Sequence, residues 1–136
     1  MDFSMINYLS VLVAAVATFV LGALWYSPLL FSKAWLKEVG FDAETMPKPN
    51  MLKTFGGSFV MFLVMDFTLA IIIQAGGKEI CWSGGMITGL VLGLGFIGTA
   101  TAVNYIYQRK SFRLWLIDAM YQTIGLGVAG VILAVS

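Results

Sequence analysis

The sequence has no histidine, a single cysteine and few charged residues. Only 11% of its 136 residues are charged, whereas a soluble domain of this size carries about 25%. The lack of histidine removes the commonest general base and the commonest ligand of zinc and haem, and the lone Cys81 excludes an intrachain disulfide. We therefore expect no metal site, no cofactor and no enzymatic activity. The net charge of +1 predicts no nucleic-acid partner.

Apolar residues are abundant instead. They make up 60% of the chain, and the mean hydropathy is +0.90, so the surplus of apolar surface has to face lipid. A helix that spans a bilayer needs about 20 mostly apolar residues, and four stretches meet this length. The sequence predicts one all-α domain over residues 1–136, an integral membrane four-helix bundle with helices at about 5–26, 54–75, 84–108 and 114–135.

A short amphipathic helix is predicted between the first and second spans, at about residues 28–39. Ser27 suits the N-cap position, and Pro28 suits the first helical position. Large apolar side chains would share one face of this helix, and Lys33 and Lys37 would share the other. This pattern is typical of a helix that lies in the membrane interface. The Trp25–Tyr26 pair before it suits the headgroup level of the bilayer.

The basic residues predict the orientation of the chain. Seven of the eight Lys and Arg residues fall in the two loops at 27–53 and 108–113, and only Lys78 falls in the loop between them. Loops rich in Lys and Arg stay in the cytoplasm, so both termini are expected outside it.

Glycines recur at every fourth position in the third span, at Gly85, Gly89 and Gly93. Such a stripe lets two helix backbones approach closely in lipid. The partner helix could belong to the same chain or to a second copy, and from this stripe we expect a homo-oligomer, with a dimer favoured.

Two acids lie inside the apolar segments. Asp66 is 12 residues past Thr54, about 18 Å along the helix and near the bilayer middle, while Asp118 is about 6 Å inside the last span. A carboxylate at the centre of a helix costs roughly 2.5–3.5 kcal/mol on insertion scales, so intramembrane acids usually face protein or water.

Polar residues gather near Asp118. Tyr121 and Gln122 follow it on the last span, and Asn104 lies at a similar depth on the preceding one. We expect these groups to form a polar pocket that opens to the cytoplasm beneath Trp25 and Tyr26. Such a pocket suits a small polar or cationic solute or a lipid headgroup. The alternative is a satisfied hydrogen-bond network that only locks two helices together.

Two stretches resemble a known family. GALWYSPLLFSKAW at 22–35 and AVNYIYQRKSFRLWLIDAMYQTIGL at 102–126 are similar to a bacterial membrane family called domain of unknown function 1761. The resemblance implies a small four-helix protein of the bacterial inner membrane, and it supplies no activity. Met120 stands where the family usually has glycine, and Asp66 belongs to neither motif. The family pattern falls on Trp25, Tyr26, Ser27, Pro28, Phe31, Trp35, Asn104, Arg109, Leu114, Ile117, Asp118 and Tyr121.

Three classes of function stay open at this point. The first is a non-enzymatic, self-associating membrane protein with the polar pocket. The second is a small proton-coupled transporter or channel, in which Asp118 or Asp66 would be the coupling group. The third, a membrane enzyme, is the weakest, because the two acids lie at different depths and no histidine accompanies them.

Overall fold

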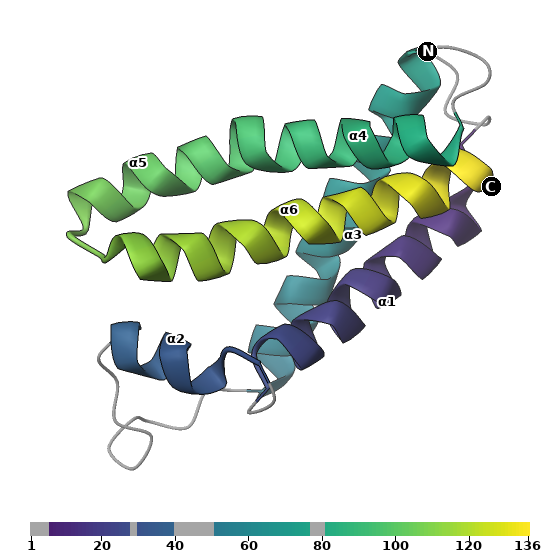
Figure 1. Cartoon of the computed structure of the whole chain (residues 1–136). Coiled ribbons are helices and arrows are strands. Elements are labelled where there is room, and N and C mark those ends of the chain that lie inside the picture. Colours follow the sequence, from purple (N-terminus) through teal and green to yellow (C-terminus); the bar gives the residue numbers. More distant parts are fainter. Residues whose placement is uncertain (1–5, 28–29, 40–50, 77–80) are drawn as a thin grey trace.

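The computed structural model describes residues 6–27, 30–39, 51–76 and 81–136. Four helices in these ranges are long and apolar enough to cross a membrane: Tyr8–Trp25, Leu52–Ala75, Trp82–Tyr107 and Phe112–Val135. The predicted all-α fold with four spans is therefore confirmed, and each predicted boundary lies within a few residues of the observed one. Figure 1 shows the helices as α1 (Tyr8–Trp25), α2 (Ser32–Val39), α3 (Met51–Ala75), α4 (Trp82–Leu92), α5 (Thr99–Tyr107) and α6 (Phe112–Val135).

The short amphipathic helix predicted between the first two spans is α2. It begins at Ser32 and not near residue 28, and residues 28–29 lie outside the described part of the chain. The Ser27 hydroxyl donates a hydrogen bond of 2.6 Å to the carbonyl oxygen of Leu24. Ser27 therefore satisfies the last turn of α1, where carbonyl groups lack a partner within the helix.

The third span is interrupted by a π-helical segment, η2 (Gly93–Gly98), which joins α4 to α5. The Trp115 indole N–H of α6 donates to the Gly98 carbonyl oxygen at 2.8 Å, and the Thr99 hydroxyl donates to that of Gly95 at 2.7 Å. Side-chain donors thus form hydrogen bonds with backbone carbonyl oxygens of this segment. Single-turn π segments are frequent at functional sites, and this one borders the groove described below.

The most enclosed of the four spans is α6, and the glycine stripe packs against it. In an apolar 18-residue stretch of α6 56% of the residues are buried, compared with 17–28% in the corresponding stretches of the other three spans. A Cβ added at Gly85 or Gly89 would collide with the α6 backbone, at Gly130 and Leu126 respectively. The stripe predicted from the sequence is therefore used within one chain, where it brings α4 and α6 into backbone contact.

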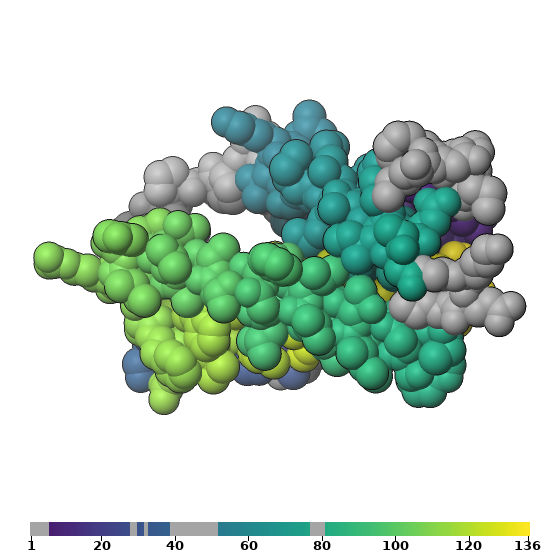
Figure 2. Space-filling view, turned by 90° about the horizontal axis from the view of Figure 1, so that it is seen from above, coloured from purple at the N-terminus to yellow at the C-terminus, as the bar shows by residue number. Residues whose placement is uncertain are grey.

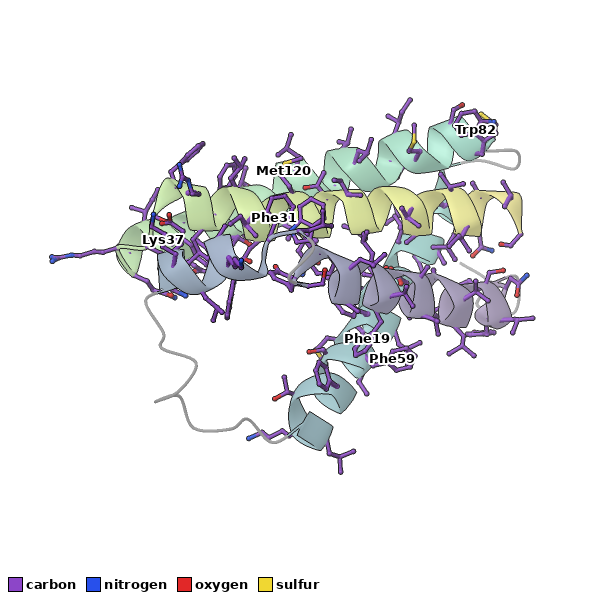
Figure 3. All side chains as sticks on the ribbon, turned by 60° about the horizontal axis from the view of Figure 1, so that its bottom comes forward. Phe19, Phe31, Lys37, Phe59, Trp82 and Met120 are labelled. Carbon is purple, nitrogen blue, oxygen red and sulfur yellow. The ribbon has the colours of Figure 1, made fainter. Side chains whose placement is uncertain are left out.

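The other side of α6 packs on α1. Ala14 and Thr18 of α1 are buried, and a Cβ added at Gly22 would lie 2.6 Å from the Tyr121 hydroxyl oxygen. Figure 3 shows Phe19 of α1 beside Phe59 of α3, and their ring centroids are 6.0 Å apart. Through these contacts α1 joins α3 to the rest of the bundle.

Large apolar side chains cover the outside of the bundle. They include Leu9, Val13 and Val20 of α1 and Phe96 of η2, which are all exposed. The described polar groups that are buried lie on the inner faces instead: Ser10, Thr18, Asp66 and Thr123. This inside-out distribution is what a bundle surrounded by hydrocarbon requires.

Candidate functional site

Asp118 of α6 is the acceptor of two tyrosine hydroxyl groups. The Tyr26 hydroxyl, just after α1, donates to Oδ1 at 2.6 Å, and the Tyr105 hydroxyl of α5 donates to Oδ2. Three segments far apart in the sequence thus converge on one carboxyl group. Hydrogen bonds to an ionised acceptor are roughly twice as strong as those between neutral groups, so this cluster fixes the position of the carboxylate.

Tyr26 is held from several sides. Burial and the hydrogen bond to the Asp118 carboxylate raise the pKa of the Tyr26 hydroxyl well above its usual range, so it stays a donor. Its ring makes edge contacts with Trp35 at 6.1 Å and with Tyr121 at 5.4 Å between centroids. The neighbouring Trp25 donates its indole N–H to the Ile117 carbonyl oxygen at 3.0 Å. The aromatic pair therefore ties the end of α1 to α6 around Asp118.

A groove of about 770 Å³ lies beside this cluster. Figure 2 shows the molecule hollowed between α3 and α5, and Asp118 lies in the wall of the groove together with Gln122. The two tyrosines do not close it off. The remaining lining comes from the end of α1 and from α2, α3, η2 and α5: Tyr26, Trp35, Leu36, Thr54, Phe55, Ser58, Met65, Ile97, Thr101 and Tyr105.

The charge of the groove is set by Asp118. Among the residues that the structure describes, no Lys or Arg nitrogen lies within salt-bridge distance of its carboxylate, and the one ion pair found joins Arg113 to Glu38 at 3.8 Å. The Nζ of Lys110 lies over the ring of Tyr105, 4.7 Å from its centroid. The groove therefore presents a carboxylate that hydrogen bonds stabilise and that has no ion pair with any Lys or Arg of the described ranges.

The residues expected in the polar pocket are partly brought together. Asp118, Gln122 and Tyr26 line the groove. Asn104 is exposed and lies outside its lining, and the next residue, Tyr105, takes the place that was expected for it. Tyr105 lies on the same polar face of the third span, but the sequence does not tell which member of that face turns inward.

The other two expected residues support the groove from behind. Tyr121 is buried behind Asp118, and its hydroxyl donates to the Thr18 carbonyl oxygen at 2.9 Å. Trp25 does not line the groove but supports Tyr121, with ring centroids 6.3 Å apart. Trp35 also lines the groove and was not predicted to do so, although its place on the apolar face of the short helix was a usable signal.

Asp66 lies apart from the groove, in the core of the bundle. It is 1% exposed, and its Oδ2 atom is buried with no hydrogen-bond partner among the described residues. One turn earlier on α3, the Phe62 ring packs edge-on against Tyr121 at 6.3 Å. This turn of α3 therefore contacts Tyr121, while Asp66 itself is absent from the groove lining.

The end of α2 is fixed to the start of α6. The Ser111 hydroxyl donates to the Glu38 carboxylate at 2.6 Å and also accepts the Leu114 backbone N–H at 3.1 Å, as an N-cap does. Because α2 contributes Trp35 and Leu36 to the groove, this contact sets the position of one of its walls.

No group of three or more possible metal ligands occurs among the described residues. The sequence pattern of one family, "Protein of unknown function (DUF1761)", matches residues 9–134. The comparisons with curated proteins and with solved structures give no match.

Proposed function

Because this chain belongs to the DUF1761 family of unknown function, we propose its function from the groove itself: it is a non-enzymatic membrane protein that binds small organic cations. The observation that carries the proposal is the Asp118 carboxylate, which two tyrosine hydroxyls hold in the groove wall without a cationic partner among the described residues. A cation from outside the protein would supply the missing charge.

The lining of the groove suits a cation with an apolar body. Aromatic rings near Asp118 attract cations through their negative faces, by roughly 0.5–2 kcal/mol each depending on desolvation. Phe55, Met65 and Ile97 give apolar contact farther along the groove. A volume of about 770 Å³ is in the range of small-molecule sites, and such sites combine a mostly apolar lining with a few convergent polar groups.

The alternative role, a locked hydrogen-bond network, is less well supported. A network that serves only to join helices would be expected to close around its polar groups, because unfilled space beside them loses packing energy. Here Asp118 and Gln122 border open volume.

Binding of tetraphenylphosphonium to the purified protein in detergent tests the proposal, with equilibrium dialysis as the measurement. Wild type should bind the cation saturably, and it should not bind tetraphenylborate, which has the same shape and the opposite charge. Asp118→Asn should weaken binding about 10- to 100-fold, since interactions with a charged group contribute roughly 1.5–3 kcal/mol.

Asn104→Ala is the control, because Asn104 is an exposed polar residue of α5 that lies outside the groove lining. It should leave the affinity unchanged. Equal affinities of wild type and Asp118→Asn, or no saturable binding by wild type, would disprove the proposed function. Mass spectrometry of the intact protein adds an independent comparison, because ligands that co-purify with wild type should be missing from Asp118→Asn.

A further inference from the structure

The groove at Asp118 extends along the helices and has an apolar part away from the carboxylate. Tyr26 and Tyr105 hold Asp118 at one position of the lining. Met65 of α3 and Ile97 of η2 also line the groove, and we call them the chain-end residues. Ile97 precedes Tyr105 by eight residues, which corresponds to about 12 Å along a helix. The lining therefore offers a charged position and, about 12 Å from it, an apolar one.

The two positions lie at different depths in the spans. Asp118 is six residues from Phe112, the first residue of α6, or about 9 Å along the helix. Met65 is 14 residues from Met51, the first residue of α3, or about 21 Å along the helix. The carboxylate is thus near an end of the bundle, and the apolar part of the groove is nearer its middle. An amphiphile in a bilayer has the same arrangement, with its head near water and its chain in the hydrocarbon.

The groove opens at the side of the bundle. Figure 2 views the helices from the side, and the hollow between α3 and α5 is visible from there. Exposed apolar side chains accompany the lining residues on both helices: Met61 and Val64 of α3, which we call the outer-face residues, and Val103 and Ile106 of α5. In a bilayer such side chains face hydrocarbon. A molecule dissolved in the membrane can therefore reach the groove.

The lining determines which charge such a molecule has to carry. Asp118 is a carboxylate, and no Lys or Arg of the described ranges belongs to the lining. An anionic head would meet a like charge, and the phosphate of a phospholipid would find no cationic partner in the lining. An ammonium head complements Asp118 instead, and the amide oxygen of Gln122, one turn farther along α6, is a possible second acceptor.

We propose that the groove binds amphiphilic ammonium ions from the bilayer, with the head at Asp118 and one alkyl chain between α3 and α5 that extends to the chain-end residues. The inference rests on the proposed function for the head position. It adds the shape of the ligand, its direction and its access from the membrane. A volume of about 770 Å³ is much larger than an ammonium head, so the chain occupies the rest of the groove.

Photolabelling in lipid nanodiscs tests where the chain lies. The probe is decyltrimethylammonium with a diazirine at the end of the chain, and mass spectrometry locates the labelled residues. Label is expected at the chain-end residues. Probe dissolved in the lipid also labels the outer-face residues, so their yield measures how much probe the membrane contains. The ratio of chain-end to outer-face label should fall about tenfold or more in Asp118→Asn, and Asn104→Ala should leave it unchanged.

Decyl sulfate with the same diazirine is the matched anion, and it should label the outer-face residues without favouring the groove. Equal ratios for the two probes would overturn the inference, and so would a ratio that does not depend on Asp118. Label confined to Trp35 and Leu36, at the other end of the groove, would overturn the direction of the chain. If tetraphenylphosphonium binds at Asp118 but the ammonium probe does not favour the chain-end residues, the proposed function stands and this inference fails. If tetraphenylphosphonium does not bind, both fail.

Competition by a cationic lipid tests access from the bilayer. Dioleoyl trimethylammonium propane has two long chains, so one of them can enter the groove only while the other stays in the surrounding lipid. Its addition to the nanodiscs should lower the ratio of chain-end to outer-face label, whereas the anionic lipid phosphatidylglycerol should not. The ratio corrects for the change in membrane charge, because both sets of residues react with probe from the same membrane. An unchanged ratio with the cationic lipid would overturn access from the side.

Discussion

The Tyr26 hydroxyl is a hydrogen-bond donor that the fold keeps protonated. Burial first, and then the Asp118 carboxylate that accepts its proton, raise the pKa of this phenol far above the pH of any cell. The donor therefore does not switch with pH, and the position of Asp118 is set independently of it. In a site meant to hold a cation, such a donor stabilises the carboxylate without neutralising its charge.

Two contacts join α2 to α6 at Glu38, and the one with Ser111 should contribute more to stability than the one with Arg113. Arg113 is 68% exposed on its side chain and lies 3.8 Å from Glu38, a geometry worth about 0–1 kcal/mol. Ser111 caps α6 and donates to Glu38 as well. Ser111→Ala should therefore destabilise the protein by about 1–2 kcal/mol, more than Arg113→Ala does, in unfolding measurements in detergent. A larger loss for Arg113→Ala would contradict this ranking.

The contact between α4 and α6 depends on the absence of side chains at two positions. The backbone of α6 lies where a Cβ of Gly85 or Gly89 would be, which is why the helices can touch along this line. The oligomer expected from the sequence remains a prediction, but the glycine stripe is occupied by α6 of the same chain. A second copy would have to use another surface.

Substitution of single glycines by alanine tests this packing. Gly89→Ala should destabilise the fold by about 1–3 kcal/mol, because the added methyl group forces α4 and α6 apart. Gly56→Ala on α3 is the control, since nothing described lies within 4 Å of its Cβ position, and it should be neutral or slightly stabilising. Thermal unfolding in one detergent measures both. Similar melting temperatures for the two variants would contradict the close approach of α4 and α6.

The whole molecule has two unlike ends, and their placement across the membrane is a prediction. The start of α1, the end of α6 and the start of α4 lie at one end, while α2 and the turn between α5 and α6 lie at the other (Figure 1). The second end holds Lys33, Lys37, Arg109, Lys110 and Arg113, which predicts that it faces the cytoplasm. The groove would then open in the cytoplasmic half of the membrane.

Cys81 can report this orientation, because it is exposed just before α4. The Ser83 hydroxyl lies 3.0 Å from its sulfur and helps lower the pKa of the thiol, which favours the reactive thiolate. A maleimide that cannot cross membranes should label Cys81 from the outside of intact cells, and Cys81→Ser gives the background. Ser83→Ala should slow labelling at neutral pH. Labelling of Cys81 only in inverted vesicles would reverse the orientation.

The sequence by itself determined which segments are surrounded by lipid and that these segments are helical. Long apolar runs, few charges and helix-compatible spacing require four spanning helices, because lipid leaves backbone groups no partner outside the helix. These are local properties, so the spans and the short amphipathic helix could be read one segment at a time. The two intramembrane acids and Tyr26 could be selected for the same reason, since polar groups are exceptional in such segments.

The tertiary structure decided which of these groups meet. Tyr26 and Asp118 are 92 residues apart in sequence, and their hydrogen bond depends on how α1 crosses α6. Helical period alone could not choose Tyr105 over Asn104, because both lie on one broad polar face and the π segment before α5 changes the rotation of that face. Asp66 is buried and absent from the groove lining, and this placement depends on how α3 packs against α1 and α6, which are distant from it in sequence.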